Sequence, residues 1–454
     1  MNGKKRILRT LRGKTVDKVP WVPFAGVHAG KLCGYSATEV LQDADKLFES
    51  LIKVHQTYLP DGMPVLFDLQ LEAEILGCEL MWGDDSPPSV LTHPLENDFR
   101  IPDKLPAEND GRIPLVLDVM RRMKSAVGKN TALYGLICGP LTLATHLRGS
   151  ELFMDTYSDE EKVKELIHYC SKVAERMADM YIRAGMDVIA VVDPVISQIS
   201  PEMFYQFLYH PLKAFFSSLK EQKVISSLFV CGDASRNLEP MCNTFPDILS
   251  IDENIDMRSA KILTDTHGIV IAGNIPLTTV MLLGTQQDNV RYITDFLTEM
   301  KSTNLIISPG CDMPYDTPPE NVVGIMDAIR NPESAKKMLE NYEAPASGTD
   351  ISLPDYTNLD KPLIEVFTVD SAACAACAYL KDAAMRLLPV FGNAIEIREY
   401  KITEIENVAR VKKMGVRNLP SIYLNGTLYS SSLIPRHDAF IAEIRRLLDT
   451  QGKK

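Results

Sequence analysis

Two cysteines near the carboxyl end of the chain, Cys374 and Cys377, have the spacing of a redox-active pair. An apolar run at 363–369 precedes them and an apolar-periodic segment follows, which predicts a strand leading into the pair and a helix starting at it. The partial positive charge at a helix N-terminus favours a thiol in its thiolate form. The pattern therefore predicts a thiol–disulfide centre in which Cys374 and Cys377 are catalytic. A zinc pair and a redox-inactive pair are the alternatives.

The elements after this pair are predicted as a strand at 394–400, a helix at 402–414, a strand at 421–424 and a final helix ending near 448. Asn425-Gly426 is a hairpin signal. This order resembles the thioredoxin fold, and Pro420 matches the cis-proline that lies against the two sulfurs in that fold. The resemblance implies a thioredoxin-like domain at 362–454, joined by a Pro-, Ser- and Asp-containing linker at 344–361 to a first domain at 1–343.

The first domain contains short apolar runs that read as buried parallel strands. They lie at 132–137, 187–192, 227–230, 248–251, 268–272 and 305–308. Each run is followed within a few residues by a polar, sulfur or Gly/Pro element, and these elements contain Asp193, Cys231, Asp252, Asn274 and Cys311. The carboxyl ends of the strands of a parallel barrel meet at one mouth, where active sites lie. We therefore expect these side chains to face one cavity.

The bulk properties limit the kind of partner. The chain has 454 residues, more than one core usually supports, and its formal net charge of -12 disfavours a nucleic-acid partner or an anionic membrane surface. It contains no apolar run long enough for a membrane helix and no secretory signal pattern. Nine scattered cysteines favour a reducing compartment in which they are buried, catalytic or metal-bound rather than paired. The predicted location is the cytoplasm.

The first domain resembles the uroporphyrinogen decarboxylase superfamily over its whole length. The resemblance is carried by eight stretches in the family's order: LRGKTVDKVPWVPF, DLQLEAEILGCEL, GPLTLATHLRG, DPVISQISPEMF, VCGDAS, SIDENIDM, AGNIPLTTVMLLGT and SPGCDMPYDTPPENV. It implies a (β/α)8 barrel with the site at its mouth. The fold prediction is therefore an α/β protein, a (β/α)8 barrel followed by a small thioredoxin-like α/β domain.

One branch of this superfamily consists of zinc-dependent methyltransferases that work with a corrinoid. That branch binds zinc through a His-x-Cys motif and a later Cys, which match Phe229, Cys231 and Cys311 here. Because phenylalanine replaces the histidine, Asp252 is the predicted third zinc ligand, and Glu72, Asp233 and His28 are further candidates. The resemblance also implies substrate contacts from four residues: His28, Glu72, Asp193 and Asn274.

The predicted activity is methyl transfer between a corrinoid and a thiol or a methylated small molecule. The chain has no corrinoid-binding stretch of its own, so the corrinoid would be carried by a partner protein. The attached domain could then reduce that corrinoid, regenerate a thiol acceptor or present a thiol to the barrel, and a separate thiol reductant is a possible partner.

Two other functions remain open. A tetrapyrrole decarboxylase would use Asp68 as its catalytic carboxylate, but the chain has no arginine between Arg12 and Arg100 to hold a substrate with many carboxylates. A non-catalytic redox or corrinoid accessory protein would account for the missing histidine.

Overall fold

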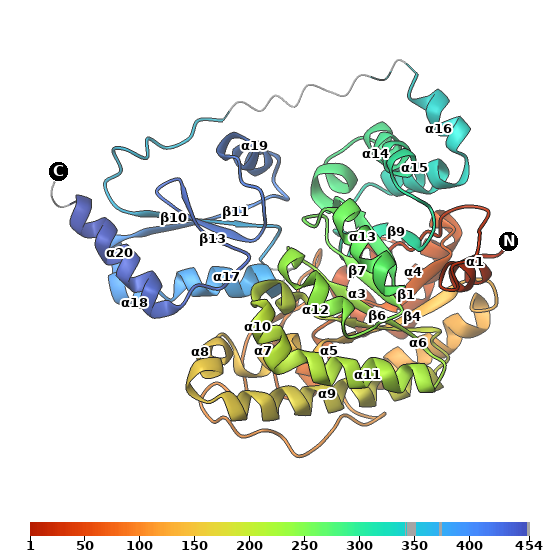
Figure 1. Ribbon diagram of the computed structural model, residues 1–454, viewed down its shortest axis with the longest axis horizontal. Helices are drawn as coiled ribbons and strands as arrows, with labels where there is room; N and C mark the ends of the chain where they lie inside the picture. Colours follow the sequence, from red (N-terminus) through yellow and green to blue (C-terminus); the bar gives the residue numbers. More distant parts are fainter. Residues whose placement is uncertain (341, 343–350, 372–374, 452–454) are drawn as a thin grey trace.

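The computed structural model describes residues 1–340, 342, 351–371 and 375–451, and two larger β-sheets organise them. The first sheet has seven strands in the order β1-β4-β5-β6-β7-β8-β9, and every neighbouring pair is parallel (Figure 1). Its strands are β1 (Gly62–Leu66), β4 (Ala132–Cys138), β5 (Val188–Val192), β6 (Ile225–Val230), β7 (Ile248–Ile251), β8 (Val270–Ile275) and β9 (Leu305–Pro309). The six strands predicted from apolar runs are confirmed, and β1 is an additional strand.

The segment around Trp21 connects the two edges of this sheet. The backbone N–H of Val22 donates to the carbonyl of Ile307 on β9, and the N–H of Asp61, next to β1, donates to the carbonyl of Trp21. Both N···O distances are 2.9 Å. These bonds complete a ring of hydrogen-bonded segments, as expected for a TIM-like barrel.

Helices surround the ring, and one or more of them lie between every two successive strands of the seven-stranded sheet. They are α1 (Gly3–Thr10), α2 (His28–Lys31), α3 (Ala37–Gln42), α4 (Ala44–Tyr58), α5 (Leu71–Ile75), α6 (Ile113–Ala126), α7 (Pro140–Arg148), α8 (Glu151–Ser158), α9 (Glu160–Arg183), η1 (Pro194–Gln198), α10 (Pro201–Met203), η2 (Phe204–Leu208), α11 (Tyr209–Glu221), η3 (Ser235–Asn237), α12 (Leu238–Cys242), α13 (Met257–His267), η4 (Leu277–Leu282), α14 (Gln286–Glu299), α15 (Pro319–Arg330) and α16 (Pro332–Met338). A short hairpin of β2 (Leu80–Met81) and β3 (Ser89–Val90) lies outside the ring.

The barrel has two apolar layers because its strands are buried on both faces. One cluster fills the space between strands and helices, and a second contains Phe24, Phe67, Tyr134 and Phe229 together with Val and Ala side chains of the strands. The ring of Phe229 lies 4.7 Å from that of Phe24 and is fully buried. Such filling makes the middle of the barrel a packed core and leaves the mouth for chemistry.

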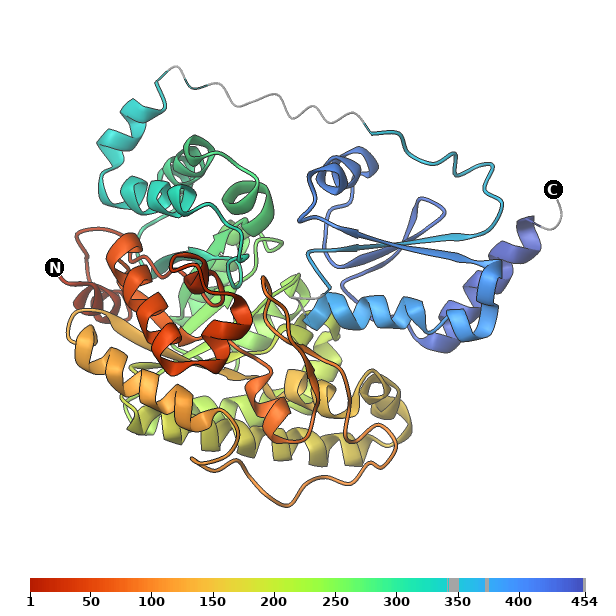
Figure 2. The same cartoon turned by 180° about the vertical axis from the view of Figure 1, so that it is seen from behind.

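The second sheet belongs to the carboxyl-terminal region, residues 363–451, and has the order β11-β10-β12-β13 (Figure 2). β10 pairs with β11 in parallel and with β12 antiparallel. The elements are β10 (Leu363–Thr368), α17 (Ala375–Met385), α18 (Leu388–Phe391), η5 (Gly392–Ala394), β11 (Glu396–Lys401), α19 (Ile405–Met414), β12 (Ser421–Leu424), β13 (Thr427–Ser431) and α20 (His437–Gln451). The predicted strands and helices of this region are confirmed, and the Leu419–Pro420 peptide is cis.

Helix α17 lies between this second sheet and the barrel in both views (Figures 1 and 2). The hydroxyl of Tyr379 is 2.8 Å from Nδ1 of His146 on α7, and Ser150 donates to Asp382 at 2.7 Å. Arg386 also donates to Glu151 on α8 at 2.7 Å. These contacts hold α17 against the barrel.

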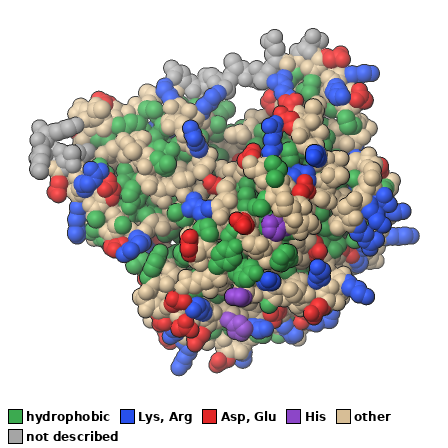
Figure 3. Space-filling model, in the orientation of Figure 1, with side chains coloured by type: hydrophobic (Ala, Val, Ile, Leu, Met, Phe, Trp, Pro, Cys, Tyr) green, Lys and Arg blue, Asp and Glu red, His purple; other side chains and the backbone are tan. Residues whose placement is uncertain are grey.

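The surface carries charges of both signs on the face drawn in Figure 3, without one sign dominating that face. In the described part of the chain, none of the helices combines the length and apolar character needed to cross a lipid bilayer.

Candidate functional site

A cavity of about 390 Å³ lies where the carboxyl ends of the barrel strands meet the carboxyl-terminal region. The barrel contributes Cys231, Asp252 and Cys311 to its lining, and the carboxyl-terminal region contributes Cys377 and Pro420. The cavity has the size of a small-molecule site. The convergence predicted for Cys231, Asp252 and Cys311 is therefore observed, and a second source of sulfur faces the same space.

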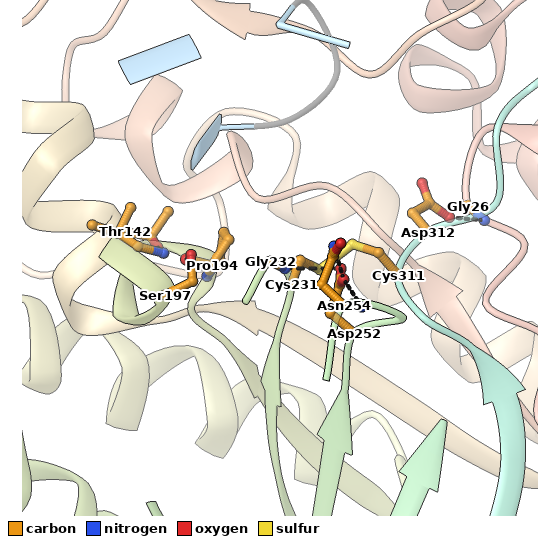
Figure 4. Close-up of a disulfide and its surroundings, with 11 residues drawn as sticks. Gly26, Thr142, Pro194, Ser197, Cys231, Gly232, Asp252, Asn254, Cys311 and Asp312 are labelled. Carbon is orange, nitrogen blue, oxygen red and sulfur yellow. Dashed lines mark hydrogen bonds between the residues drawn. A yellow bond between two sulfur atoms is a disulfide. The ribbon is translucent and has the colours of Figure 1, made fainter. Parts of the chain in front are cut away.

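Cys231 and Cys311 form a disulfide at this cavity (Figure 4). Cys231 directly follows β6 and Cys311 lies two residues beyond β9, so the bond joins two strand ends that are not neighbours in the sheet. Their Cα atoms are 5.6 Å apart, although 80 positions separate them in sequence. The expectation that the cysteines are unpaired is wrong for these two, because barrel closure brings their strand ends together.

Asp252 lies beside this disulfide and is held by three donors. Its carboxylate accepts from the N–H of Gly232 at 2.8 Å, and from the backbone and side-chain nitrogens of Asn254 at 2.9 and 2.6 Å. Burial raises the pKa of Asp252 above its ordinary value. Gly232 has a φ of 87°, and a Cβ there would lie 2.7 Å from Oγ of Ser197. Only glycine fits this turn without strain, and the turn gives Asp252 one of its three donors.

Cys374, the other predicted catalytic cysteine of the redox pair, lies outside the described residues. Cys377 is fully buried in α17 and lines the cavity. The carbonyl of Ala376, the residue before it, accepts a hydrogen bond from the side-chain amide of Gln198 on the barrel. The barrel therefore contacts the backbone beside the predicted redox pair.

The zinc prediction does not fit the donor set as the structure holds it. Two of the three predicted ligands, Cys231 and Cys311, are joined to each other, and within the described ranges no group of three or more His, Cys, Asp or Glu residues could hold a metal ion. Phe229, at the position of the family's histidine, packs inside the barrel and cannot ligate a metal. We therefore derive no step of the reaction through zinc.

His28 and Glu72, predicted to contact substrate, do not line the cavity. The ring nitrogens of His28 lie 3.0 Å from the carbonyl of Tyr315 and 2.7 Å from the hydroxyl of Tyr58, and burial lowers its pKa to about 4. One oxygen of Glu72 accepts from the N–H of Cys138 at 3.0 Å, and burial raises its pKa to about 7. Both side chains are held by hydrogen bonds in the protein interior, and their contact with substrate stays a prediction.

Asp193 and Asn274 also do not line the cavity. Asp193 accepts from the N–H groups of Leu141 and Thr142 at the start of α7, at 3.0 and 2.9 Å. Asn274 donates to the carbonyls of Asp252 and Ile255 at 3.0 and 2.8 Å. In the structure Asp193 anchors α7 and Asn274 holds the loop that carries Asp252, and their contact with substrate stays a prediction.

Asp68, the catalytic candidate of the decarboxylase alternative, does not line the cavity either. It accepts from Arg112 at 2.7 Å and from the N–H of Gln70 at 2.9 Å. Its side chain is fully shielded from solvent. The carboxylate therefore serves a buried ion pair.

The sequence analysis missed Asn254 and Asp312, which both line the cavity. Asp312 directly follows Cys311 and accepts from the N–H of Gly26 at 2.7 Å. Burial raises the pKa of Asp312 to about 8. Their place in the sequence could have revealed them, because each follows a predicted strand. Asn254 lies in the stretch SIDENIDM and Asp312 lies in SPGCDMPYDTPPENV.

The free energy of unfolding should depend on pH through Asp312. An unfolded aspartate titrates near pH 4, so between about pH 4 and pH 8 the folded chain holds a proton that the unfolded chain has released. Stability therefore falls as pH rises through this window. In urea titrations, Asp312→Asn should reduce that fall by about 1–2 kcal/mol between pH 5 and pH 8. Asp316→Asn, which changes an exposed carboxylate paired with Lys31, is the matched control; an equal effect of both variants would contradict the assignment.

The lining of the cavity carries acidic side chains. It includes Asp85, Asp252, Asp312, Asp316 and Asp370, and none of the described lining residues is a lysine, arginine or histidine. Two of these carboxylates, Asp316 and Asp370, pair with lysines that lie behind the lining. The cavity therefore offers no cation of its own to bind an anionic group.

Residues 2–332 match the model of the uroporphyrinogen decarboxylase (URO-D) family. The chain belongs to that family. A methyltransferase from Methanosarcina mazei has the same fold in this part, with a TM-score of 0.66 at 24% identity, over 75% of this chain and 99% of that one.

Two similar curated proteins are methyltransferases. One is the methylcobamide:CoM methyltransferase MtbA of Methanosarcina acetivorans, 28% identical over 72% of this chain and 97% of its own length. Another is a methylated-thiol–coenzyme M methyltransferase of Methanosarcina mazei, 26% identical over 73% of this chain and 89% of its own. The uroporphyrinogen decarboxylase of Rickettsia bellii is 23% identical over 65% of this chain and 87% of its own. In sequence, the two methyltransferases are more similar to this chain than this decarboxylase is.

Proposed function

We propose that this chain transfers a methyl group between a corrinoid, carried by a partner protein, and a thiol or methylated small molecule bound in the cavity. The observation that carries the proposal is the position of Cys231 and Cys311 at the barrel mouth, on a cavity of small-molecule size. The methyltransferases that it resembles act with a methylcobamide or a methylated thiol by name. In their reduced form, the two cysteines would place thiol sulfur in the cavity where we propose that the methyl group is transferred.

The decarboxylase alternative is less well supported. A substrate with many carboxylates needs cations, and the described lining of the cavity supplies none. Asp68, the carboxylate predicted for that chemistry, forms an ion pair with Arg112.

For the carboxyl-terminal region we propose a thioredoxin-like thiol-redox domain at 362–454, joined by the linker 344–361 to a barrel domain at 1–343. Support comes from the strand order, from α17 starting within the Cys-x-x-Cys stretch, and from the cis peptide before Pro420. Cys377 and Pro420 also line the same cavity. We place the protein in the cytoplasm, where reductants of the dithiol class are available.

Zinc remains a prediction, and it applies only to the reduced pair. A disulfide offers no thiolate to a metal, so we expect the oxidised chain to contain far less than one zinc ion per molecule. Metal analysis before and after treatment with a dithiol measures this. Stoichiometric zinc in the oxidised chain, lost in Cys311→Ala, would contradict the disulfide description.

The methyl-transfer proposal is tested by the spectral change of methylcobalamin when the reduced chain and a thiol are added. We expect demethylation to be faster than with thiol alone. We also expect 2-mercaptoethanol to be used at least as well as coenzyme M, because the sulfonate of coenzyme M meets an acidic lining without a cation. A strong preference for coenzyme M would contradict this account of the cavity.

Two controls separate the alternatives. Release of carbon dioxide from uroporphyrinogen would favour the decarboxylase. Binding of a corrinoid protein without demethylation by any thiol would favour the non-catalytic accessory protein.

A further inference from the structure

We propose that the Cys374–Cys377 dithiol reduces the Cys231–Cys311 disulfide of the same chain, so that the sulfur pair of the barrel cycles between a disulfide and a dithiol. The substrate of the carboxyl-terminal region would then be the Cys231–Cys311 disulfide in the barrel of the same chain. This inference goes beyond methyl transfer and can be tested without a corrinoid.

The first support is that the barrel disulfide and Cys377, the described member of the other pair, line one cavity. Its lining contains three of the described cysteines, namely Cys231 and Cys311 from the barrel and Cys377 from α17. Five other described cysteines do not line it: Cys33, Cys78, Cys138, Cys170 and Cys242. In Figure 4 the barrel strands approach the disulfide from one side, and the faint blue ribbon of the carboxyl-terminal region lies on the other. The remaining sulfur of the described lining is the thioether of Met313, which cannot take part in thiol–disulfide exchange.

The second support is that the barrel contacts the two elements that border Cys377. Tyr379 and Asp382 are on α17 and Arg386 directly follows it, and each contacts the barrel through the hydrogen bonds described above. On the other side of the cavity, Asn418 donates to Asp233 at 2.7 Å, two residues from Pro420 and two from Cys231. The contacts therefore hold α17, which carries Cys377, against the barrel beside the cavity that the disulfide also lines.

The third support is the unequal exposure of the two disulfide-bonded residues. Cys231 is 5% exposed, whereas Cys311 is only partly buried. A thiolate that approaches through the cavity therefore reaches the sulfur of Cys311 first. Sγ of Cys231 is then the leaving group, and it ends the step next to Gly232 and Asp252.

The exchange balances in electrons and protons. A thiolate of the Cys374–Cys377 pair attacks Sγ of Cys311, a mixed disulfide forms, and Cys231 leaves as a thiolate that takes up a proton. The second thiol of the pair loses its proton and attacks the mixed disulfide, which frees Cys311 and leaves a Cys374–Cys377 disulfide. Two electrons have moved to the barrel, and an external dithiol reductant restores the pair by the same chemistry.

The consequence is control over the site of methyl transfer. While Cys231 and Cys311 are joined, neither offers a thiolate as nucleophile or ligand. Reduction by the attached region would make both available. Because the two centres share one chain, reduction should not depend on a collision between molecules.

The test follows the thiol state of the fully oxidised, full-length chain after addition of dihydrolipoic acid. Samples are quenched with acid and alkylated, and the peptides containing Cys231 and Cys311 are quantified by mass spectrometry. We expect this pair to be reduced about tenfold faster, or more, in the native chain than in the Cys374→Ser/Cys377→Ser double variant. The rate should not change with protein concentration. Equal rates, or a rate that rises with protein concentration, would overturn the proposal.

A trapping experiment identifies the intermediate. Cys377→Ser removes the thiol that resolves the mixed disulfide, so a disulfide between Cys374 and Cys311 should accumulate. Cys33→Ser changes a partly exposed cysteine outside the cavity and should behave like the native chain. Absence of the mixed disulfide in Cys377→Ser, or free thiols at Cys231 and Cys311 in the oxidised native chain, would contradict the exchange.

A variant that leaves every cysteine in place tests the role of docking. Arg386→Ala removes the contact of α17 with Glu151 and should slow reduction of the barrel pair several-fold. Arg446→Ala is the matched control, because it removes an ion pair with Glu443 within α20 and leaves the contacts of α17 intact. Equal rates in the two variants would show that docking does not position the exchange.

Discussion

Replacing Cys231 with alanine should lower kcat/KM for demethylation of methylcobalamin by the reduced chain by about 100-fold or more. Under the proposed function, Cys231 and Cys311 are the barrel cysteines that face the cavity, and no other described barrel sulfur can replace them. The substitution removes only Sγ, so the loss should reflect the chemistry of that sulfur. Steady-state rates with 2-mercaptoethanol measure it.

The two cysteines should also act as a unit. We expect Cys311→Ala to be about as damaging as Cys231→Ala, and the double variant to be little worse than either single variant. Cys170→Ala is the control, because Cys170 is fully buried on α9 and does not line the cavity. Normal activity of Cys231→Ala would refute a role of this sulfur in methyl transfer and would leave the thiol–disulfide exchange to be judged by its own assay.

The second large effect is expected for Arg112→Ala, which should lower the free energy of unfolding by about 3–5 kcal/mol. Arg112 donates to the shielded carboxylate of Asp68 and to Glu74, both at 2.7 Å, and lies 4.9 Å from the ring centre of Trp82. Its removal leaves the buried carboxylate of Asp68 with the N–H of Gln70 as its remaining donor among the described residues. Urea unfolding followed by circular dichroism measures the change.

Arg122→Ala provides a matched comparison. Arg122 pairs with Asp45 and Asp118, whose side chains are 89% and 55% exposed. Exposed pairs of this kind contribute less than about 1 kcal/mol. A similar loss of unfolding free energy in Arg112→Ala and Arg122→Ala would show that the Arg112–Asp68 ion pair does not stabilise the fold as we expect.

Local pattern was enough to predict the elements of both regions. The apolar runs before Cys231, Asp252 and Asn274 are β6, β7 and β8, because a strand buried on both faces needs a continuous apolar run. The same reasoning placed the strand before the Cys-x-x-Cys pair and the hairpin at Asn425-Gly426. It also put Cys231, Asp252 and Cys311 at one mouth, since parallel strands end on the same side.

The orientation of polar side chains could not be read from that pattern. His28, Glu72, Asp193 and Asn274 lie close to strand ends or in the matching stretches, yet each turns into the interior and takes backbone or hydroxyl partners there. A strand end limits where a Cα lies, whereas the partners of a carboxylate or amide depend on loops that come from distant parts of the chain.

The sequence by itself determined a parallel barrel, a following α/β region with a Cys-x-x-Cys pair, and the sulfur-bearing positions of the mouth. Apolar periodicity and turn residues act over short stretches, so they suffice for these features. Tertiary structure alone decided that Cys231 and Cys311 bond to each other, that Phe229 fills the barrel interior, and that Cys377 faces the same cavity. Each of these depends on closure of the ring and on docking of α17, which bring together residues about 80 or more positions apart.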